Sequence, residues 1–73
     1  MDKISTFELR GQSVDMLYNN GKLAYTFEFN GKSYGAKVEV ASRSVIDIAS
    51  ATFLLLTNAL ETIEAVKKDE QNS

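Results

Sequence analysis

The chain contains no cysteine, no histidine and no proline among its 73 residues. The absence of cysteine excludes disulfide bonds and thiolate ligands. The absence of histidine removes the commonest ligand of transition metals and the usual general base at neutral pH. Domains of this size are often stabilised by disulfides, a metal ion or a partner subunit. Of these three, the composition leaves association with a partner subunit, and we expect no metal and no cofactor.

The length predicts one domain, residues 1–73, with no linker and no internal repeat. The N-terminus has no apolar stretch after Lys3, so we do not expect a signal peptide. The most hydrophobic window, Val45 to Leu60, is interrupted by polar residues and is shorter than the ~20 residues that a spanning helix needs. Because the lack of cysteine also fits a reducing compartment, we expect a soluble, cytoplasmic protein without membrane contact.

Two Asn-Gly pairs divide the first half of the chain, at residues 20–21 and 30–31. Asn-Gly is the strongest short signal for a β-hairpin, because both central residues of a type I′ turn have positive φ. Between the pairs, Lys22 to Phe29 alternates with the period of two that is typical of a strand. A further strand is expected from Lys32 to Val40, where Gly35 marks either a bulge or a place of close packing.

More strand signals precede the first Asn-Gly pair. Apolar residues alternate over residues 14–18, and residues 4–9 contain three more. Gly11-Gln12 is a candidate type II′ turn between two strands, because that turn needs Gly at its first central position. The alternative is one long strand bent at Gly11. The fold class we expect is α+β, a three- or four-stranded antiparallel β-meander followed by one long C-terminal helix on one sheet face, and we favour four strands.

The second half of the chain predicts one helix from Ser44 to Lys68. Its apolar residues recur at the i, i+3, i+4, i+7 spacing of an amphipathic helix. Ser44 is a candidate N-cap, and Lys67 and Lys68 suit the negative end of the helix dipole. The polar tail, residues 69–73, is expected to be frayed. The stripe expected to face the sheet consists of Ile48, Thr52, Leu55, Leu56 and Ala59.

This helix carries more apolar surface than one small sheet can cover. A helix of ~24 residues is ~36 Å long, whereas a strand of about eight residues spans ~26 Å, so we expect the helix to overhang the sheet. Soluble monomers rarely expose the contiguous apolar patch that would result. A second copy related by a two-fold axis would cover it, so we expect a homodimer or higher oligomer. The residues expected at this interface are Phe53, Leu54, Leu60 and Ile63.

The polar side of the helix is acidic. Between Ser44 and Val66 the chain has three acids, Asp47, Glu61 and Glu64, and no base. Two carboxylates at i and i+3 can bind a hard cation, but the usual carboxylate-bridged metal sites also need histidine. We interpret this acidic flank as solvated surface, with a contact for a basic protein partner as the alternative. It argues against nucleic acid on the helix, because phosphate binding needs clustered Lys or Arg.

The sheet offers a second interpretation, nucleic-acid binding. Lys22, Lys32 and Lys37 belong to its strands, and its aromatic side chains could stack bases. Those aromatic residues occupy the face that must receive the helix, so we assign them to the core. Lys37 shares the outer face with Glu39, and a face of mixed sign is typical of ordinary surface. We therefore keep nucleic-acid binding as the alternative and do not favour it.

The sequence shows no motif for catalysis. No serine has a histidine or lysine spaced to activate it, and nucleophilic catalysis needs such a base. We therefore predict a small non-enzymatic protein-interaction module, homodimeric, that binds and modulates another protein. Its size and its lack of catalytic chemistry are compatible with an accessory or inhibitor protein of a phage or mobile element.

Overall fold

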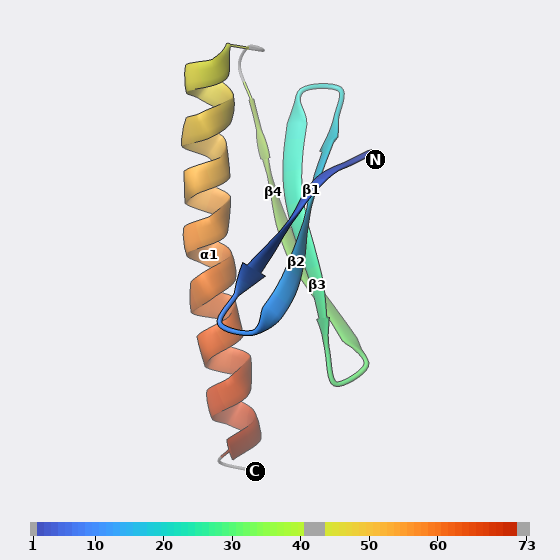
Figure 1. Cartoon of the computed structure of the whole chain (residues 1–73), viewed down its shortest axis with the longest axis vertical. Helices are drawn as coiled ribbons and strands as arrows, with labels where there is room; N and C mark the ends of the chain where they lie inside the picture. The colour runs from blue at the N-terminus through green and yellow to red at the C-terminus, as the bar shows by residue number, and fades with distance from the viewer. Residues whose placement is uncertain (1, 41–43, 72–73) are drawn as a thin grey trace.

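The computed structural model of the chain describes residues 2–40 and 44–71. Four antiparallel strands form one sheet in the order β1-β2-β3-β4, and a long helix follows them (Figure 1). These elements confirm the predicted α+β fold, a four-stranded meander followed by one helix packed against it. Their bounds are β1 (Asp2–Leu9), β2 (Gln12–Asn19), β3 (Lys22–Phe29), β4 (Lys32–Glu39) and α1 (Val45–Gln71).

The two Asn-Gly pairs close the second and third hairpins. Their φ angles are 49° and 78° at Asn20-Gly21, and 53° and 78° at Asn30-Gly31. Two consecutive residues with positive φ are what a type I′ turn requires, and this turn matches the twist of the flanking strands. The prediction of both hairpins is confirmed.

The first hairpin also turns on two residues, but not the predicted ones. Its central residues are Arg10 and Gly11, with φ of 51° and 78°. The predicted type II′ turn at Gly11-Gln12 is therefore wrong by one residue, and so is the alternative of one bent strand. Positive φ is uncommon for residues other than Gly, Asn and Asp. An Arg at position 10 therefore does not indicate the first central residue of such a turn.

Two local features distinguish the edge strands. In β1, Lys3 pairs with Leu17 and Ser5 with Met16, so Ile4 is the extra residue of a bulge. In β4, Gly35 lies opposite Thr26 in an uninterrupted register. A Cβ at Gly35 would approach the carbonyl oxygen of Tyr25 to 2.5 Å. Of the two roles predicted for Gly35, close packing is the one that the structure shows.

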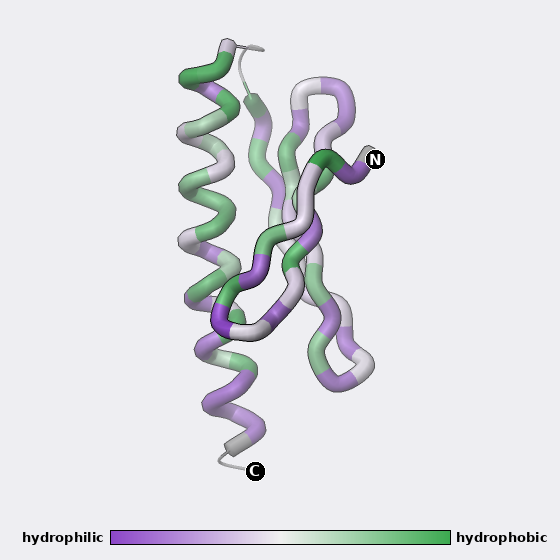
Figure 2. Tube along the Cα trace, viewed as in Figure 1, coloured by the Kyte–Doolittle hydropathy of each residue, from purple (hydrophilic) through white to green (hydrophobic). Residues whose placement is uncertain are grey.

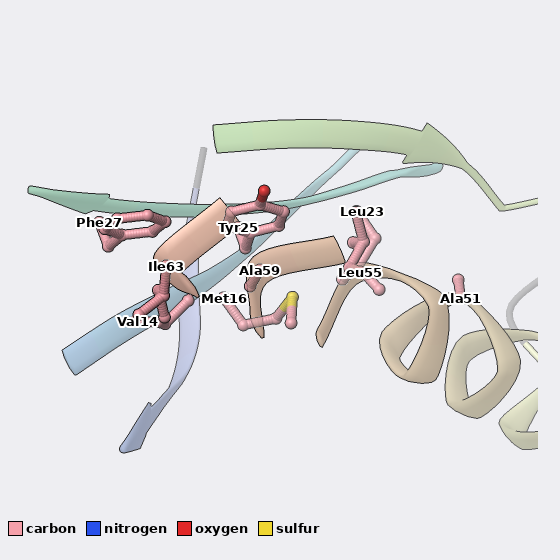
Figure 3. Packing of buried hydrophobic residues seen from close by; sticks show 9 residues of the cluster. All are labelled: Val14, Met16, Leu23, Tyr25, Phe27, Ala51, Leu55, Ala59 and Ile63. Atoms are coloured by element: carbon pink, nitrogen blue, oxygen red, sulfur yellow. The ribbon is translucent and has the colours of Figure 1, made fainter. Parts of the chain in front are cut away.

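The core lies between α1 and one face of the sheet (Figure 3). α1 contributes one residue every four positions, and β2 and β3 contribute alternate residues. In the predicted stripe, Leu55 and Ala59 are buried, whereas Ile48, Thr52 and Leu56 are only partly buried. The buried set is Val14, Met16, Leu23, Tyr25, Phe27, Ala51, Leu55, Ala59 and Ile63.

The two ends of α1 are well defined. The hydroxyl of Ser44 accepts a hydrogen bond from the backbone N–H of Asp47 at 3.1 Å, as expected for an N-cap. At the other end the helix continues to Gln71, three residues beyond the predicted end at Lys68. Of the tail expected to fray, residues 69–71 are helical and residues 72–73 lie outside the described part of the chain.

The sheet holds the two halves of α1 unequally. The helix packs mainly on β3 and β4, and the β1–β2 turn reaches its C-terminal half (Figure 1). There the Arg10 guanidinium lies 2.8 Å from the Glu64 carboxylate, and the Lys67 ammonium donates to the carbonyl oxygen of Arg10 at 2.8 Å. At the β3–β4 turn, the Asn30 amide donates to the carboxylate of Glu70. These turn contacts all fall on residues 64–70.

Candidate interaction surface

The N-terminal half of α1 exposes large apolar side chains. Val45 is 83% exposed, Ile46 77% and Phe53 70%. Figure 2 shows that the first turns of the helix are mainly hydrophobic and the last turns hydrophilic. The two hairpin turns cover parts of the hydrophilic end, so the hydrophobic end is the part with least cover.

The residues predicted for a subunit interface separate into three groups. Phe53 and Leu54 are exposed, at 70% and 62%, and Leu60 is partly buried. Ile63 is fully buried at 0%, so its assignment to an interface is wrong. Ile63 continues the every-fourth-residue series of the core, and the C-terminal half of α1 lies on the sheet instead of beyond it.

The prediction missed Val45 and Ile46 as surface residues. Helix length alone does not say which end of a helix extends past a sheet, and the predicted interface, Phe53, Leu54, Leu60 and Ile63, does not include the first turn of α1. The predicted N-cap at Ser44 was the available signal for their exposure. Val45 and Ile46 follow this cap directly, so they lie at the end of the helix and far from the middle of the stripe that packs on the sheet. The exposed apolar surface is therefore closer to the start of α1 than expected.

The exposed apolar residues lie on two different sides of α1. Ile46, Phe53 and Leu60 are seven residues apart, with Ala49 and Leu56 between them, which places all five on one side of a helix. Ile46, Ala49 and Phe53 are exposed, Leu60 is partly buried, and Leu56 is partly buried and packed against the edge of the core. We call Ile46, Ala49, Phe53, Leu56 and Leu60 the apolar seam. Leu54 follows Phe53 directly, so it points about 100° away from the seam. It is seven residues from both Asp47 and Glu61 and shares their side.

The three residues of the predicted acidic flank are all exposed, but they do not share one environment. Asp47 and Glu61 are exposed beside Leu54. Glu64 is also exposed but forms the ion pair with Arg10. No group of three or more acidic residues is placed to hold a metal ion in residues 2–40 and 44–71. The flank therefore consists of two carboxylates around one exposed leucine.

The lysines of the sheet do not form one basic patch. Lys22 lies directly opposite Glu39. Lys37 lies opposite Ala24, two positions further along the same hairpin, and shares a strand and a face with Glu39. Lys32 pairs with Phe29 at the far end of the β3–β4 hairpin. Phosphate binding needs clustered positive charge, and here the charges are spread over both ends of the strands.

The aromatic side chains of the sheet, assigned to the core from the sequence, are divided between buried and partly buried positions, and Tyr18, Phe29 and Tyr34 are partly buried against the core. Tyr25 and Phe27 are buried. The Phe27 ring stacks on Tyr25 with 6.2 Å between centroids and on Tyr34 with 5.2 Å. Because Tyr25 and Phe27 are buried beneath α1, their rings are not accessible to bases in this structure.

The described residues offer little that converges on a small ligand. An open hollow of about 270 Å³ lies between the β3–β4 turn and the last turns of α1, with Lys32, Asp69 and Glu70 in its lining. In residues 2–40 and 44–71 no charged residue is buried, and no buried side-chain polar atom lacks a hydrogen-bond partner. The apolar surface of α1 is therefore the most distinctive feature of the exterior.

One helix, Val45–Glu70, is long and apolar enough to cross a membrane when judged by length and composition alone. A core helix of a soluble protein meets the same criterion. Here one side of the helix carries Ala51, Leu55 and Ala59 into the core against the sheet. Of the most apolar window of this helix, 22% is buried, so most of its length is exposed or partly exposed.

Comparison with known proteins identifies no relative. No protein-family model matches the chain, and neither a curated protein nor a solved structure does. The function has to be argued from the surface just described.

Proposed function

We propose that the chain is a small, non-enzymatic protein-interaction module that pairs with a second copy of itself and binds and modulates another protein. The observation that supports this proposal best is the exposure of Val45, Ile46 and Phe53, at 83%, 77% and 70%. These side chains lie in one half of one helix, and soluble monomers rarely expose large apolar residues contiguously. Burial of such side chains against another protein is favourable by roughly 25 cal/mol per Å².

A protein partner fits this surface better than a membrane does. Helices that lie on membranes combine an apolar face with a polar face rich in Lys and Arg, which attracts anionic lipid headgroups. Between Ser44 and Val66 α1 has Asp47, Glu61 and Glu64 and no base. An anionic membrane would repel this helix, whereas an apolar protein surface would not.

A protein partner also fits better than nucleic acid, the alternative function. The lysines of the sheet are dispersed, and Lys22 faces Glu39 directly. A binder of nucleic acid through these lysines would shift labelled DNA or RNA at low salt and lose it as salt is raised. We expect no shift at low salt, and a salt-dependent shift would favour the alternative.

The second protein would contact the side of α1 that the seam does not use. Leu54 is 62% exposed there, and Asp47 and Glu61 flank it. An apolar anchor between carboxylates suits a partner with a small apolar site surrounded by Lys or Arg, because complementary charge steers association and selects partners. An accessory or inhibitor protein of a phage or mobile element could act in this way, by covering a basic surface of its target.

Affinity capture from the lysate of the native host tests the second half of the proposal. The bait is the full chain, and the matched control is the double variant Asp47→Asn and Glu61→Gln, which keeps size and helix but removes both charges. We expect one or a few basic proteins to be captured by the wild type and much less by the variant. Equal capture by both baits would contradict a role for the acidic flank.

A further inference from the structure

We infer that two copies pair through their apolar seams with the two α1 helices antiparallel, and that the two-fold axis passes close to Phe53. This inference rests on the proposed self-association and adds its geometry. It also separates Phe53 from Leu54, two neighbours that the sequence placed in the same interface.

The spacing of the seam is that of helices packed side by side. Ile46, Phe53 and Leu60 repeat every seven residues, and Ala49 and Leu56 each follow three residues after a member of that series. A repeat of seven with an apolar residue at the intermediate position keeps one seam facing a partner helix. From Ile46 to Leu60 the seam covers 15 residues, or ~22 Å of helix. No charged residue belongs to it.

The seam has a physical end on its C-terminal side. One further repeat of seven leads from Leu60 to Lys67, and this residue donates to the Arg10 carbonyl oxygen. Glu64, one turn after Leu60, is held by the Arg10 guanidinium at 2.8 Å. The β1–β2 turn therefore occupies the continuation of the seam, and a second helix can approach only over residues before it.

This obstruction favours the antiparallel arrangement. In a parallel pair both β1–β2 turns would lie at the same height between the helices and would collide. In an antiparallel pair centred on Phe53, positions whose numbers sum to about 106 (twice 53) face one another. Glu64 and Lys67 would then face positions 42 and 39, which precede the start of the second helix at Val45. Each turn would lie beyond the end of the opposite helix.

The same register makes the seam self-complementary, as a two-fold interface must be. Phe53 meets Phe53 of the second copy, and Ile46 meets Leu60. The small Ala49 lies near Leu56 of the second copy, so a small side chain faces a large one. Antiparallel helices also place opposite ends of their dipoles together. Leu54, about 100° away, contacts nothing across this seam.

The size of the seam sets the strength of the pair. A large aromatic side chain such as Phe53 can bury on the order of 150–250 Å², and the other members of the seam are smaller. Interfaces with a total area below about 1,200 Å² belong to weak or transient complexes. We therefore expect dissociation in the micromolar range, with pairs at tens of micromolar and single chains at high dilution.

The absence of cysteine from the chain allows a direct test by disulfide trapping. Single variants Phe53→Cys, Leu54→Cys and Ile46→Cys are oxidised in a glutathione redox buffer at tens of micromolar, and so is an equimolar mixture of Ile46→Cys and Leu60→Cys. A disulfide forms only where two Cα atoms come within about 7 Å. We expect cross-linking of Phe53→Cys with itself and of the mixture, several-fold above that of Leu54→Cys or Ile46→Cys alone.

Other results would overturn the arrangement. Strong self-linking of Ile46→Cys would indicate parallel helices, and linking of Leu54→Cys equal to that of Phe53→Cys would place the interface on another side. Phe53→Cys could weaken pairing because it removes the Phe53 side chain. The mixture of Ile46→Cys and Leu60→Cys keeps Phe53, so it tests the antiparallel arrangement independently of that loss. Sedimentation of the wild type separates the two proposals: a dimer with the wrong cross-links rejects only the geometry, whereas a monomer rejects self-association itself.

Discussion

The hydroxyl of Tyr25 donates a hydrogen bond to Oδ1 of Asn58 at 2.5 Å, which ties the centre of β3 to α1. The Tyr25 side chain is buried, and its hydroxyl is also 3.2 Å from Oγ1 of Thr62. A buried hydroxyl needs such partners, because leaving it unpaired costs about 1–3 kcal/mol. This link adds to the packing of Leu55, Ala59 and Ile63 in holding one side of α1 against the sheet.

We expect Asn58→Ala to lower the free energy of unfolding by about 1 kcal/mol, since the Tyr25 hydroxyl keeps only Thr62 as partner. Denaturation in urea measures the change. Thr57→Ala is the matched control, because Thr57 is the exposed neighbour and its hydroxyl donates to the Phe53 carbonyl oxygen of the same helix. Equal losses in both variants would show that the Tyr25–Asn58 bond contributes nothing specific.

Gly35→Ala should be destabilising because of space, not because of backbone angle. The added Cβ would lie 2.5 Å from the Tyr25 carbonyl oxygen, and the strands would have to move apart. We expect a loss of about 1–3 kcal/mol, as for other overpacked sites. Ser33→Ala, on the same strand and two residues away, should change the unfolding midpoint little. If Gly35→Ala proved as stable as Ser33→Ala, the close approach of β3 and β4 would be refuted.

Arg10 sets two opposing effects against each other. Its φ of 51° is unfavourable for an L-residue, while its side chain pairs with an exposed Glu64, an interaction worth about 0–1 kcal/mol. Arg10→Ala loses the ion pair and keeps the unfavourable angle, whereas Arg10→Asn introduces a residue that tolerates it. We expect Arg10→Asn to be more stable than Arg10→Ala in thermal or urea unfolding. The opposite order would mean that the positive φ at position 10 does not limit the stability of the turn.

Ser44→Ala removes the side chain that accepts from the Asp47 N–H at 3.1 Å. The loss of an N-cap typically costs about 0.5–2 kcal/mol. Ser44→Asn should retain most of the stability, because Asn caps helices as well as Ser does. Helix content by circular dichroism and urea unfolding distinguish the variants. A Ser44→Ala protein that unfolds like the wild type would argue that other contacts start the helix.

Periodicity and turn chemistry account for the parts of the fold that were predictable. Alternation over Lys22 to Phe29 gave β3 its bounds, and Asn-Gly at 20–21 and 30–31 gave two of three turns. The turn at Arg10 was missed because Arg rarely adopts a positive φ. Its contacts with Glu64 and Lys67 join residues more than fifty positions apart, which a local pattern does not show.

The surface was less predictable than the fold. The spacing of apolar residues in α1 showed that two sides of the helix are apolar, but the rotation of α1 on the sheet depends on tertiary contacts such as Tyr25–Asn58. For this reason Ile63 was placed outside and is in fact in the core, whereas Val45 and Ile46 were overlooked. The sides of α1 that stay exposed are those that do not pack on the sheet.

The central claim, self-association through the exposed half of α1, is tested most directly by sedimentation equilibrium of the wild type and of Phe53→Asp. The chain has a mass of 8.1 kDa. At tens of micromolar we predict twice that mass for the wild type and the single-chain mass for Phe53→Asp, with unchanged helix content because the side chain is 70% exposed. A wild-type species of 8.1 kDa at these concentrations would contradict the account.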